Sequence, residues 1–382
     1  MSFARFGESG PEFEVLAPGR VNLIGDHIDY LGYDVLPVAL AQCVRITCRV
    51  RLDGRVRISS ALHDEDVSLE PSASIPPASP GHWSNYVRAA IQALHTPDCR
   101  SGFDGIISSD LPPAAGLSSS SALVVASAIA YLHANGESFD GLDLAERMAR
   151  AERYVGTEGG GMDQAVCLLA EAGTANRISF SPLRVTYVPI PAGWQFLVAD
   201  SLERAEKSSS ARAAYNARAH EARRAIENVT VAGSIDGKAP ERSGDVLAAG
   251  ERLLDEPFLR RLRHVVSEAD RVRRAVDALR DDDPLLFGRI MNESHASLQH
   301  DFEVSTKALD RLCGILVRAG AHGARLTGAG LGGSVVALCS QDAAAALIRA
   351  VDHEYYALRG VVPAARERFL VEPSGGARIR PL

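Results

Sequence analysis

The chain has 382 residues, of which 46% are hydrophobic and 23% are charged, and its formal net charge is −7. This composition is typical of a soluble globular protein, and the length predicts about two or three domains rather than one small core. A mildly acidic chain has no general electrostatic attraction to nucleic acid or to anionic membranes, so we expect neither kind of partner.

Strand patterns dominate the first part of the chain. Segments 13–19 and 35–41 resemble strands, and residues 44–51 alternate strictly between apolar and polar side chains, which predicts a half-buried strand. Asp53-Gly54 then predicts a tight turn into residues 54–59 as a hairpin. A Pro- and Ser-rich loop over 71–80 precedes a further strand from Phe103.

The pattern then changes to a helical period, and later to a mixture. One helix is expected around 123–130, a second between Asp140 and Gly156, and a long helix over 262–279. Strand patterns at 184–190 and 194–200 predict the start of a second sheet, a break covers 232–244, and the tail gives strand, glycine loop, strand and helix. Since no βαβ rhythm is visible, we expect an α+β fold with two domains, 1–180 and 181–382.

The segment LPPAAGLSSSSA (residues 111–122) has the composition of an anion-binding loop. A strand leads through prolines and Gly116 into serines that open a helix. A helix start offers free backbone N–H groups and the positive end of the dipole, and glycine permits close approach of the main chain. The alternative is only a well-capped helix. The chain has no G-x-x-x-x-G-K-[ST] motif, so this is not a Walker-type loop.

The segment GAGLGG (328–333) formally matches the dinucleotide-binding pattern G-x-G-x-x-G. That pattern should follow a strand and open a helix, whereas here it joins one predicted strand to another. We therefore expect a tight turn beside a ligand, or a plain hairpin loop, rather than a nicotinamide or flavin site.

Two polar segments complete the candidates. Residues 19–30 gather Arg20, Asp26, His27 and Asp29, a density of hydrogen-bonding groups that suits a polyhydroxylated ligand, although a solvated loop is the alternative. Asp163 follows three glycines, where a carboxylate can be presented as a general base or can simply cap the next helix.

Taken together, these segments resemble the motifs of the GHMP small-molecule kinases, and within them the galactokinase branch. APGRVNLIGDHIDY is similar to the sugar signature, LPPAAGLSSSSAL to the phosphate loop, GGGMDQ to the catalytic aspartate segment and GARLTGAGLGGSVVAL to the third motif, and NESHASL (292–298) also fits. The resemblance covers nearly the whole chain. It implies an N-terminal domain like ribosomal protein S5 domain 2, a ferredoxin-like C-terminal domain, and a site between them.

The resemblance also implies a reaction, transfer of the ATP γ-phosphate to the anomeric C1 hydroxyl of D-galactose, and a role for each matched residue. Asp163 is the catalytic carboxylate, with Arg20 as its cationic companion. The other implied sugar contacts are Asp26, His27, Asp29 and Tyr215. The implied nucleotide contacts are Gly116, Leu117, Ser118, Ser119, Ser120, Ser121 and Trp83, and the implied Mg²⁺ ligands are Ser120 and Glu152.

Three alternatives remain at this stage. The branch usually has Glu at the position of Asp26, whose carboxylate reaches about 1.5 Å less, and GTEGGGMDQ is closer to the N-acetylgalactosamine kinase subgroup, so that sugar or another galactose derivative is the first alternative. The second is a non-catalytic sugar sensor, which could dispense with the base or the serine loop that this chain retains. The third, a mevalonate- or homoserine-type kinase, does not fit the DHID cluster.

The cellular setting is expected to be the cytoplasm. The six cysteines are scattered singly, with no CxxC pair, and such thiols usually sit reduced in a cytosolic core. No signal peptide is visible, and the longest apolar stretch, 122–134, is shorter than the roughly 20 residues that span a bilayer. We expect a monomer or a weak homodimer.

Overall fold

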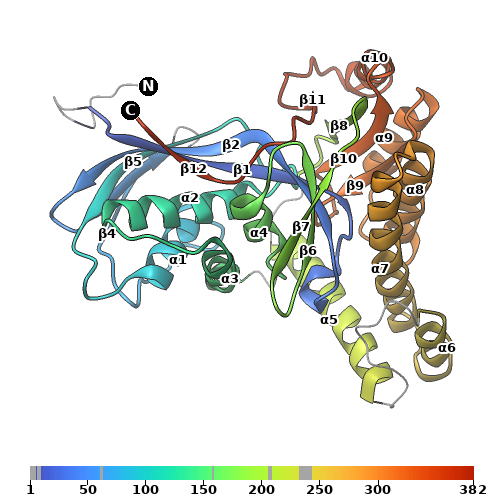
Figure 1. Cartoon of the computed structure of the whole chain (residues 1–382), viewed down its shortest axis with the longest axis horizontal. Helices are drawn as coiled ribbons and strands as arrows, with labels where there is room; N and C mark the ends of the chain where they lie inside the picture. The colour runs from blue at the N-terminus through green and yellow to red at the C-terminus, as the bar shows by residue number, and fades with distance from the viewer. Residues whose placement is uncertain (1–5, 7–9, 61–62, 157–158, 205–208, 232–242) are drawn as a thin grey trace.

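The structure is a computed structural model that describes residues 6, 10–60, 63–156, 159–204, 209–231 and 243–382. It confirms the α+β prediction. Two sheets lie side by side along the long axis of the molecule, each covered by helices, and the C-terminal strand returns to the sheet in which the chain begins (Figure 1).

The first sheet has six strands in the described residues, and its two longest strands, β1 (Phe13–Ile24) and β2 (Leu36–Arg51), are neighbours. Its order is β12 (Arg378–Pro381), β1, β2, β5 (Gly102–Ser109), β3 (Val56–Ser60) and β4 (His63–Leu69). Its helices are α1 (Ser84–Leu94), α2 (Ser119–Ala134), α3 (Gly141–Ala151) and α4 (Met162–Leu169). Helices α2 and α4 pack on β1 and β2, and α1 and α3 pack against these two helices.

The predicted hairpin of residues 44–51 with 54–59 is wrong, although both strands exist. Strand β5 lies between β2 and β3, antiparallel to the first and parallel to the second. The Asp53-Gly54 signal reports only a local reversal of the chain, whereas the pairing is decided by β5, which buries Phe103 and Ile107. The start of β5 lies very close to the residue before β3, because a Cβ on Gly102 would lie 2.0 Å from the carbonyl oxygen of Arg55.

The second sheet has the order β11 (Arg368–Leu370), β8 (Trp194–Asp200), β10 (Ser334–Ser340) and β9 (Gly323–Thr327). It begins at β8, and the expectation that residues 184–190 open it is wrong. Strand β7 (Arg184–Pro189) is largely exposed, and among the described strands it pairs with β6 (Thr174–Ser179) alone. Strand β8 is buried along nearly its whole length, as an interior strand with covered faces must be.

Helices dominate the second half, as expected from its periodicity. They are α5 (Ser209–Val231), α6 (Ser243–Leu253), α7 (Phe258–Arg280), α8 (Pro284–His300), α9 (Lys307–Arg318) and α10 (Ala344–Val351). Short turns of helix complete the fold at Asp29–Leu31, Glu152–Val155, Asp352–Tyr356 and Ala357–Arg359. Most of the predicted break at 232–244 lies outside the described residues. The domain boundary near residue 180 stays a prediction.

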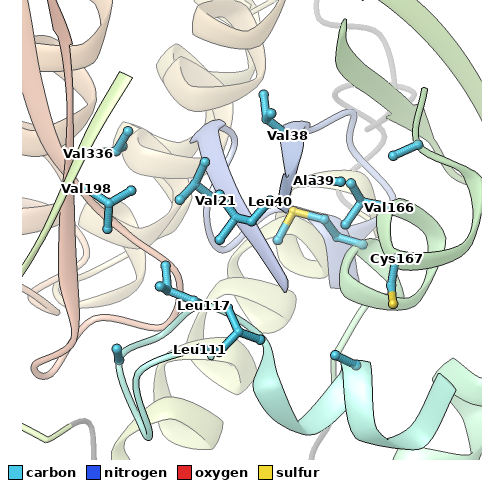
Figure 2. Packing of buried hydrophobic residues seen from close by; sticks show 14 of the residues in the cluster. Val21, Val38, Ala39, Leu40, Leu111, Leu117, Val166, Cys167, Val198 and Val336 are labelled. Carbon is cyan, nitrogen blue, oxygen red and sulfur yellow. The ribbon is translucent and has the colours of Figure 1, made fainter. Parts of the chain in front are cut away.

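One hydrophobic cluster runs through both sheets and fixes the loops of the site. Figure 2 shows Leu111 and Leu117, which enclose residues 112–116 ahead of the serines, beside Val21 of β1 and near Val198 and Val336 of the second sheet. Because all five side chains are buried, the loop between the two leucines is fastened at both ends to the junction of the sheets.

Candidate active site

A cavity of about 450 Å³ opens where the two sheets meet, and every site residue named from the sequence lines it. The cavity wall is built from the end of β1 and the turn after it, the loop before α2, the end of α3, the start of α4, the N-terminal part of α5 and the β9–β10 loop. Segments that are far apart in the sequence thus converge on one volume, as in ligand sites generally.

Asp163 lies in the first turn of α4, two residues after Gly161, which adopts a left-handed φ of 102° as the N-cap. Its Oδ1 accepts a hydrogen bond from Nε of Arg20 at 2.9 Å, and its Oδ2 accepts one from Oγ of Ser118 at 2.5 Å. Arg20 also donates to the carbonyl oxygen of Gly116 at 2.5 Å. The carboxylate is therefore held in one orientation by two motifs, while its side chain stays 26% exposed to the cavity.

The serine-rich loop leads directly into the start of α2. Ser118 caps α2 in the left-handed region, with φ of 60°, and the backbone N–H groups at the start of α2 have no partner within the helix. The side chains of Ser118, Ser119, Ser120 and Ser121, with Gly116 and Leu117, all line the cavity. Such a helix start is a ready site for an anion.

The glycine loop joins β9 to β10, as expected, and packs on the serine-rich loop. A Cβ on Gly328 would lie 2.6 Å from the carbonyl oxygen of Gly116, and one on Gly333 would lie 3.1 Å from that of Ala115. Both glycines also have positive φ, which side chains disfavour. The glycine loop therefore supports the serine-rich loop. It joins two strands, so it is not a dinucleotide-binding motif, which would join a strand to a helix.

Asp29 and His27 approach the cavity from the turn after β1. Oδ2 of Asp29 accepts a hydrogen bond from N of Gly160 at 3.1 Å, so the glycine segment before Asp163 packs directly on this turn. His27 has a φ of 66° and its Nε2 lies 3.1 Å from the carbonyl oxygen of Ala329. Residues 157–158 of the same glycine segment lie outside the described residues.

Burial shifts the pKa values of three residues on this side of the cavity, Asp29, His27 and Tyr215. Burial, with the neighbouring charge of Asp163, raises the pKa of Asp29 to about 6. Burial, with the nearby His264, lowers the pKa of His27 to about 3, so this imidazole is neutral at physiological pH. Burial and the charges of Asp29 and Asp163 also raise the pKa of Tyr215 well above its usual range. This side of the cavity thus offers the protonated hydroxyl of Tyr215 and the neutral imidazole of His27 beside the acidic groups Asp29 and Asp163.

Tyr215 reaches the cavity from α5 and belongs to an aromatic group. Its ring centroid lies 5.5 Å from that of His27 and 6.2 Å from that of Tyr30, and the rings of His27 and Phe302 pack in a tilted arrangement with centroids 4.5 Å apart. Sequence reasoning missed Tyr30 and Phe302. Tyr30 stands inside the first motif and could have been included, whereas Phe302 lies in the connection after α8 with no local signal.

Asp26 lies at the edge of the cavity with its carboxylate turned toward a buried arginine of the second sheet. It lines the cavity, but its side chain is only 3% exposed, and it forms an ion pair with Arg325 of β9 at 2.5 Å. Sequence reasoning missed Arg325, although the residue stands within the third motif, because nothing local shows that a strand arginine is buried.

Glu152 lies directly after α3 and accepts a hydrogen bond from Oγ of Ser121 at 2.6 Å. The same hydroxyl lies 3.4 Å from Oδ2 of Asp163. The sequence resemblance had paired Glu152 with Ser120, the adjacent residue, which also lines the cavity. In the described part of the chain, no three His, Cys, Asp or Glu side chains are grouped as a metal site.

The far end of the cavity is largely apolar. Trp83 caps the start of α1, its ring stacks on His82 at 5.7 Å, and it lines the cavity together with Tyr86, Val44 and Ile107. An apolar lining of this kind suits a planar ring system.

Family models match three parts of the chain. They are the galactokinase galactose-binding signature (residues 3–50), the GHMP kinases N-terminal domain (85–171) and the GHMP kinases C-terminal domain (275–357). A galactokinase of Roseiflexus sp. (strain RS-1) is 40% identical over 87% of this chain and 84% of its own length, and a galactokinase of Bos taurus is 36% identical over 91% and 88%.

A solved structure agrees with these relatives. The crystal structure of Lactococcus lactis galactokinase complexed with galactose superposes with a TM-score of 0.88 and 28% identity, covering 98% of this chain and 97% of that one. The fold is therefore that of a GHMP kinase, an enzyme that transfers a phosphoryl group. Within that class, the chain belongs to the galactokinase family.

In the described ranges, no helix combines the length and the apolar character needed to cross a bilayer.

Proposed function

We propose that this protein transfers the γ-phosphoryl group of ATP to the anomeric C1 hydroxyl of D-galactose, giving α-D-galactose 1-phosphate and ADP. One observation carries the proposal: the Asp163 carboxylate, held by Arg20 and Ser118, stands beside the helix start of the serine-rich loop in a shared cavity. A base for a hydroxyl and a cradle for a triphosphate therefore face the same volume.

The chemistry follows from these neighbours. An anomeric hydroxyl is a weak nucleophile, and Asp163 accepts its proton as the oxygen attacks the γ-phosphorus and ADP departs. A positioned base of this kind contributes about 10²–10⁴-fold. Arg20 offsets the charge that develops on the sugar oxygen. The phosphoryl group in flight spreads negative charge over its oxygens, which the N–H groups at the start of α2 offset.

Mg²⁺ is the metal that this donor set fits. The Glu152 carboxylate and the Ser120 hydroxyl are oxygen ligands, which Mg²⁺ prefers, and both line the cavity next to the serine-rich loop. When bound, the ion would neutralise charge on the phosphates of ATP. Trp83 would flank the adenine.

The sugar would lie against the turn after β1 and α5. Arg20, His27, Asp29, Asp163 and Tyr215 supply donors and acceptors around the cavity. Protonated Tyr215 suits donation to a sugar oxygen, and the carboxylates suit acceptance from sugar hydroxyls. Neutral His27 donates its Nε2–H to the carbonyl oxygen of Ala329, so its Nδ1 suits acceptance from a sugar hydroxyl. Asp26 lines the same side of the cavity.

We further propose a cytoplasmic location and a monomer or weak homodimer. The six cysteines all fall within the described residues, and none forms a disulfide, which supports a reducing compartment.

The test is a comparison of acceptor sugars. We expect ADP release with galactose, a ³¹P signal of a sugar 1-phosphate, and kcat/KM for galactose at least about a hundredfold above that for N-acetylgalactosamine or galacturonate. A preference of that size for either rival sugar would overturn the choice of substrate. Sugar binding without ADP release would indicate a sensor.

A further inference from the structure

We propose that Arg325 and Glu268, which do not line the cavity, are positioning residues for the sugar-binding turn, and that Asp26 is their anchor rather than a ligand of the sugar. The inference rests on the proposed function, because it assigns the parts of the same sugar site. It departs from the expectation that Asp26 faces a sugar hydroxyl.

Arg325 fastens the turn from the side of the second sheet. Its side chain is fully buried on β9, and its guanidinium donates to the carbonyl oxygen of Leu23 at 2.8 Å and to Oδ2 of Asp26 at 2.5 Å. A planar guanidinium can hold two acceptors in fixed geometry, which an ammonium cannot do. The end of β1 and the start of the turn are therefore oriented by one side chain.

Glu268 fastens the same turn from α7. Oε1 accepts hydrogen bonds from N of Gly25 at 2.8 Å and from Oγ of Ser294 at 2.7 Å, and Oε2 accepts from Nε of Arg271 at 2.6 Å. Burial alone would disfavour its charge, but Arg271 and Arg325 outweigh burial and lower the pKa of Glu268 to about 2. The carboxylate is thus a permanent acceptor for the Gly25 amide.

The carboxylate of Asp26 is already occupied. Besides the pair with Arg325, its Oδ1 accepts from Nδ2 of Asn22 at 3.1 Å and from N of Gly328 at 3.3 Å. A carboxylate offers about four acceptor positions, so three of them are used within the protein. Little capacity is left for a sugar hydroxyl, and this gives a physical reason for the short side chain: an additional methylene would drive the carboxylate into these partners.

Further hydrogen bonds hold Asn22 and the main chain of Asp26, in the segment before Asp29. Oγ1 of Thr327 accepts from N of Asn22 at 2.9 Å and donates to its carbonyl oxygen at 3.1 Å. Nε2 of His264 lies 3.1 Å from the carbonyl oxygen of Asp26. The segment that carries His27 and Asp29 into the cavity is therefore held by β9 and α7, elements from the other half of the chain.

Charge balance makes the arrangement testable. Asp26 and Glu268 are matched by Arg325 and Arg271, so removing one partner leaves an unpaired buried charge. The double variant Asp26→Asn/Arg325→Met removes one charge of each sign and keeps the Glu268–Arg271 pair. It should fold even if Arg325→Met alone does not, and Arg325→Lys supplies a further variant that keeps the charge.

The experiment is a double-variant cycle on the full chain, with KM for galactose, KM for ATP, kcat and melting temperature measured for each variant. We expect Arg325→Lys, Glu268→Gln and Asp26→Asn each to raise KM for galactose by about tenfold or more, with KM for ATP changed by less than about threefold. The double variant Asp26→Asn/Arg325→Met should show about the same galactose KM as the worse of the single variants at these two positions, because Asp26 and Arg325 hold the turn through one shared ion pair.

Two results would overturn the inference. If the losses in galactose KM multiply in the double variant, Asp26 contacts the sugar independently of Arg325. If the variants lose only melting temperature and keep the wild-type galactose KM, the cluster is structural alone. Arg318→Gln, which breaks an ion pair with Glu354 at a side chain that is 67% exposed, is the matched control and should leave all constants unchanged. Failure of the wild-type chain to phosphorylate galactose would instead reject the proposed function.

Discussion

Arg20 and Asp163, 143 positions apart in the chain, are joined by a hydrogen-bonded ion pair of 2.9 Å between Nε and Oδ1. Arg20 comes from β1 and Asp163 from the first turn of α4, and the same guanidinium holds the carbonyl oxygen of Gly116 in the serine-rich loop. One arginine thus couples the proposed base to the proposed triphosphate cradle, so a change at this residue should affect both.

Arg20→Lys should lower kcat by about ten- to a hundredfold, because an ammonium cannot bond Asp163 and Gly116 in the geometry of a guanidinium. KM for ATP should rise as well, since the loop loses one of its supports. Steady-state kinetics check both effects. Arg280→Lys, at an exposed position of α7, is the matched control. If Arg20→Lys and Arg280→Lys have the same kcat and the same KM for ATP, Arg20 does not couple Asp163 to the serine-rich loop.

Gly328→Ala should raise KM for ATP by about tenfold or more, because a Cβ there would meet the carbonyl oxygen of Gly116 at 2.6 Å and would need a left-handed φ of 85°. Gly244→Ala is the control: it lies in α6 with open space around it, and a helical alanine is favoured over glycine. Nucleotide titration of both proteins gives the measurement. Unchanged nucleotide affinity in Gly328→Ala would show that the glycine loop does not support the site.

Asp29 should give galactose binding a pH dependence near pH 6. Its pKa is raised to about 6, so the carboxylate is protonated below that pH and becomes a stronger acceptor above it. KM for galactose should therefore fall as pH rises from 5 to 7, and Asp29→Asn should remove that dependence. His27, with a pKa of about 3, does not titrate in this range.

Ionisation of Asp29 should favour galactose binding but should lower the stability of the fold. Because the folded-state pKa of Asp29 lies above its ordinary value of 3.8, ionising this carboxyl disfavours the fold, fully so above pH 6. Asp29→Asn should therefore gain melting temperature at pH 7 relative to wild type, and the gain should shrink toward pH 4. A variant that loses stability at pH 7 would contradict this account of the burial.

Glu152→Gln should raise the Mg²⁺ concentration needed for half-maximal activity by about tenfold, because a neutral amide is a weaker ligand than a carboxylate. Activity is measured across a Mg²⁺ titration at saturating ATP and galactose. Glu146→Gln, at a half-exposed position of α3, is the control. The same Mg²⁺ requirement in wild type and Glu152→Gln would remove the residue from the metal site.

The local parts of the site could be predicted from the sequence, because their signals lie within short segments. A close approach of the main chain to a ligand is predicted from the sequence alone at Gly116, at Gly328 and at the serines that begin α2. Asp163 stands out for the same reason, since three glycines precede it.

The non-local parts could not be predicted. Glu268 and Arg271 occur in a helix whose buried face is apolar by periodicity, and only the packing of α7 on the turn after β1 shows that a buried carboxylate holds the amide of Gly25. The insertion of β5 between β2 and β3 likewise depends on a pairing that is distant in sequence, so the Asp53-Gly54 turn signal could not reveal it.

The most direct measurement is the turnover of Asp163→Asn with galactose and ATP, together with calorimetric binding of galactose to the same variant. Asparagine preserves the size of the side chain but accepts no proton at neutral pH. We predict galactose binding within about threefold of wild type and a kcat lowered by about a hundredfold or more. A kcat close to that of wild type would contradict the role of Asp163 as the base.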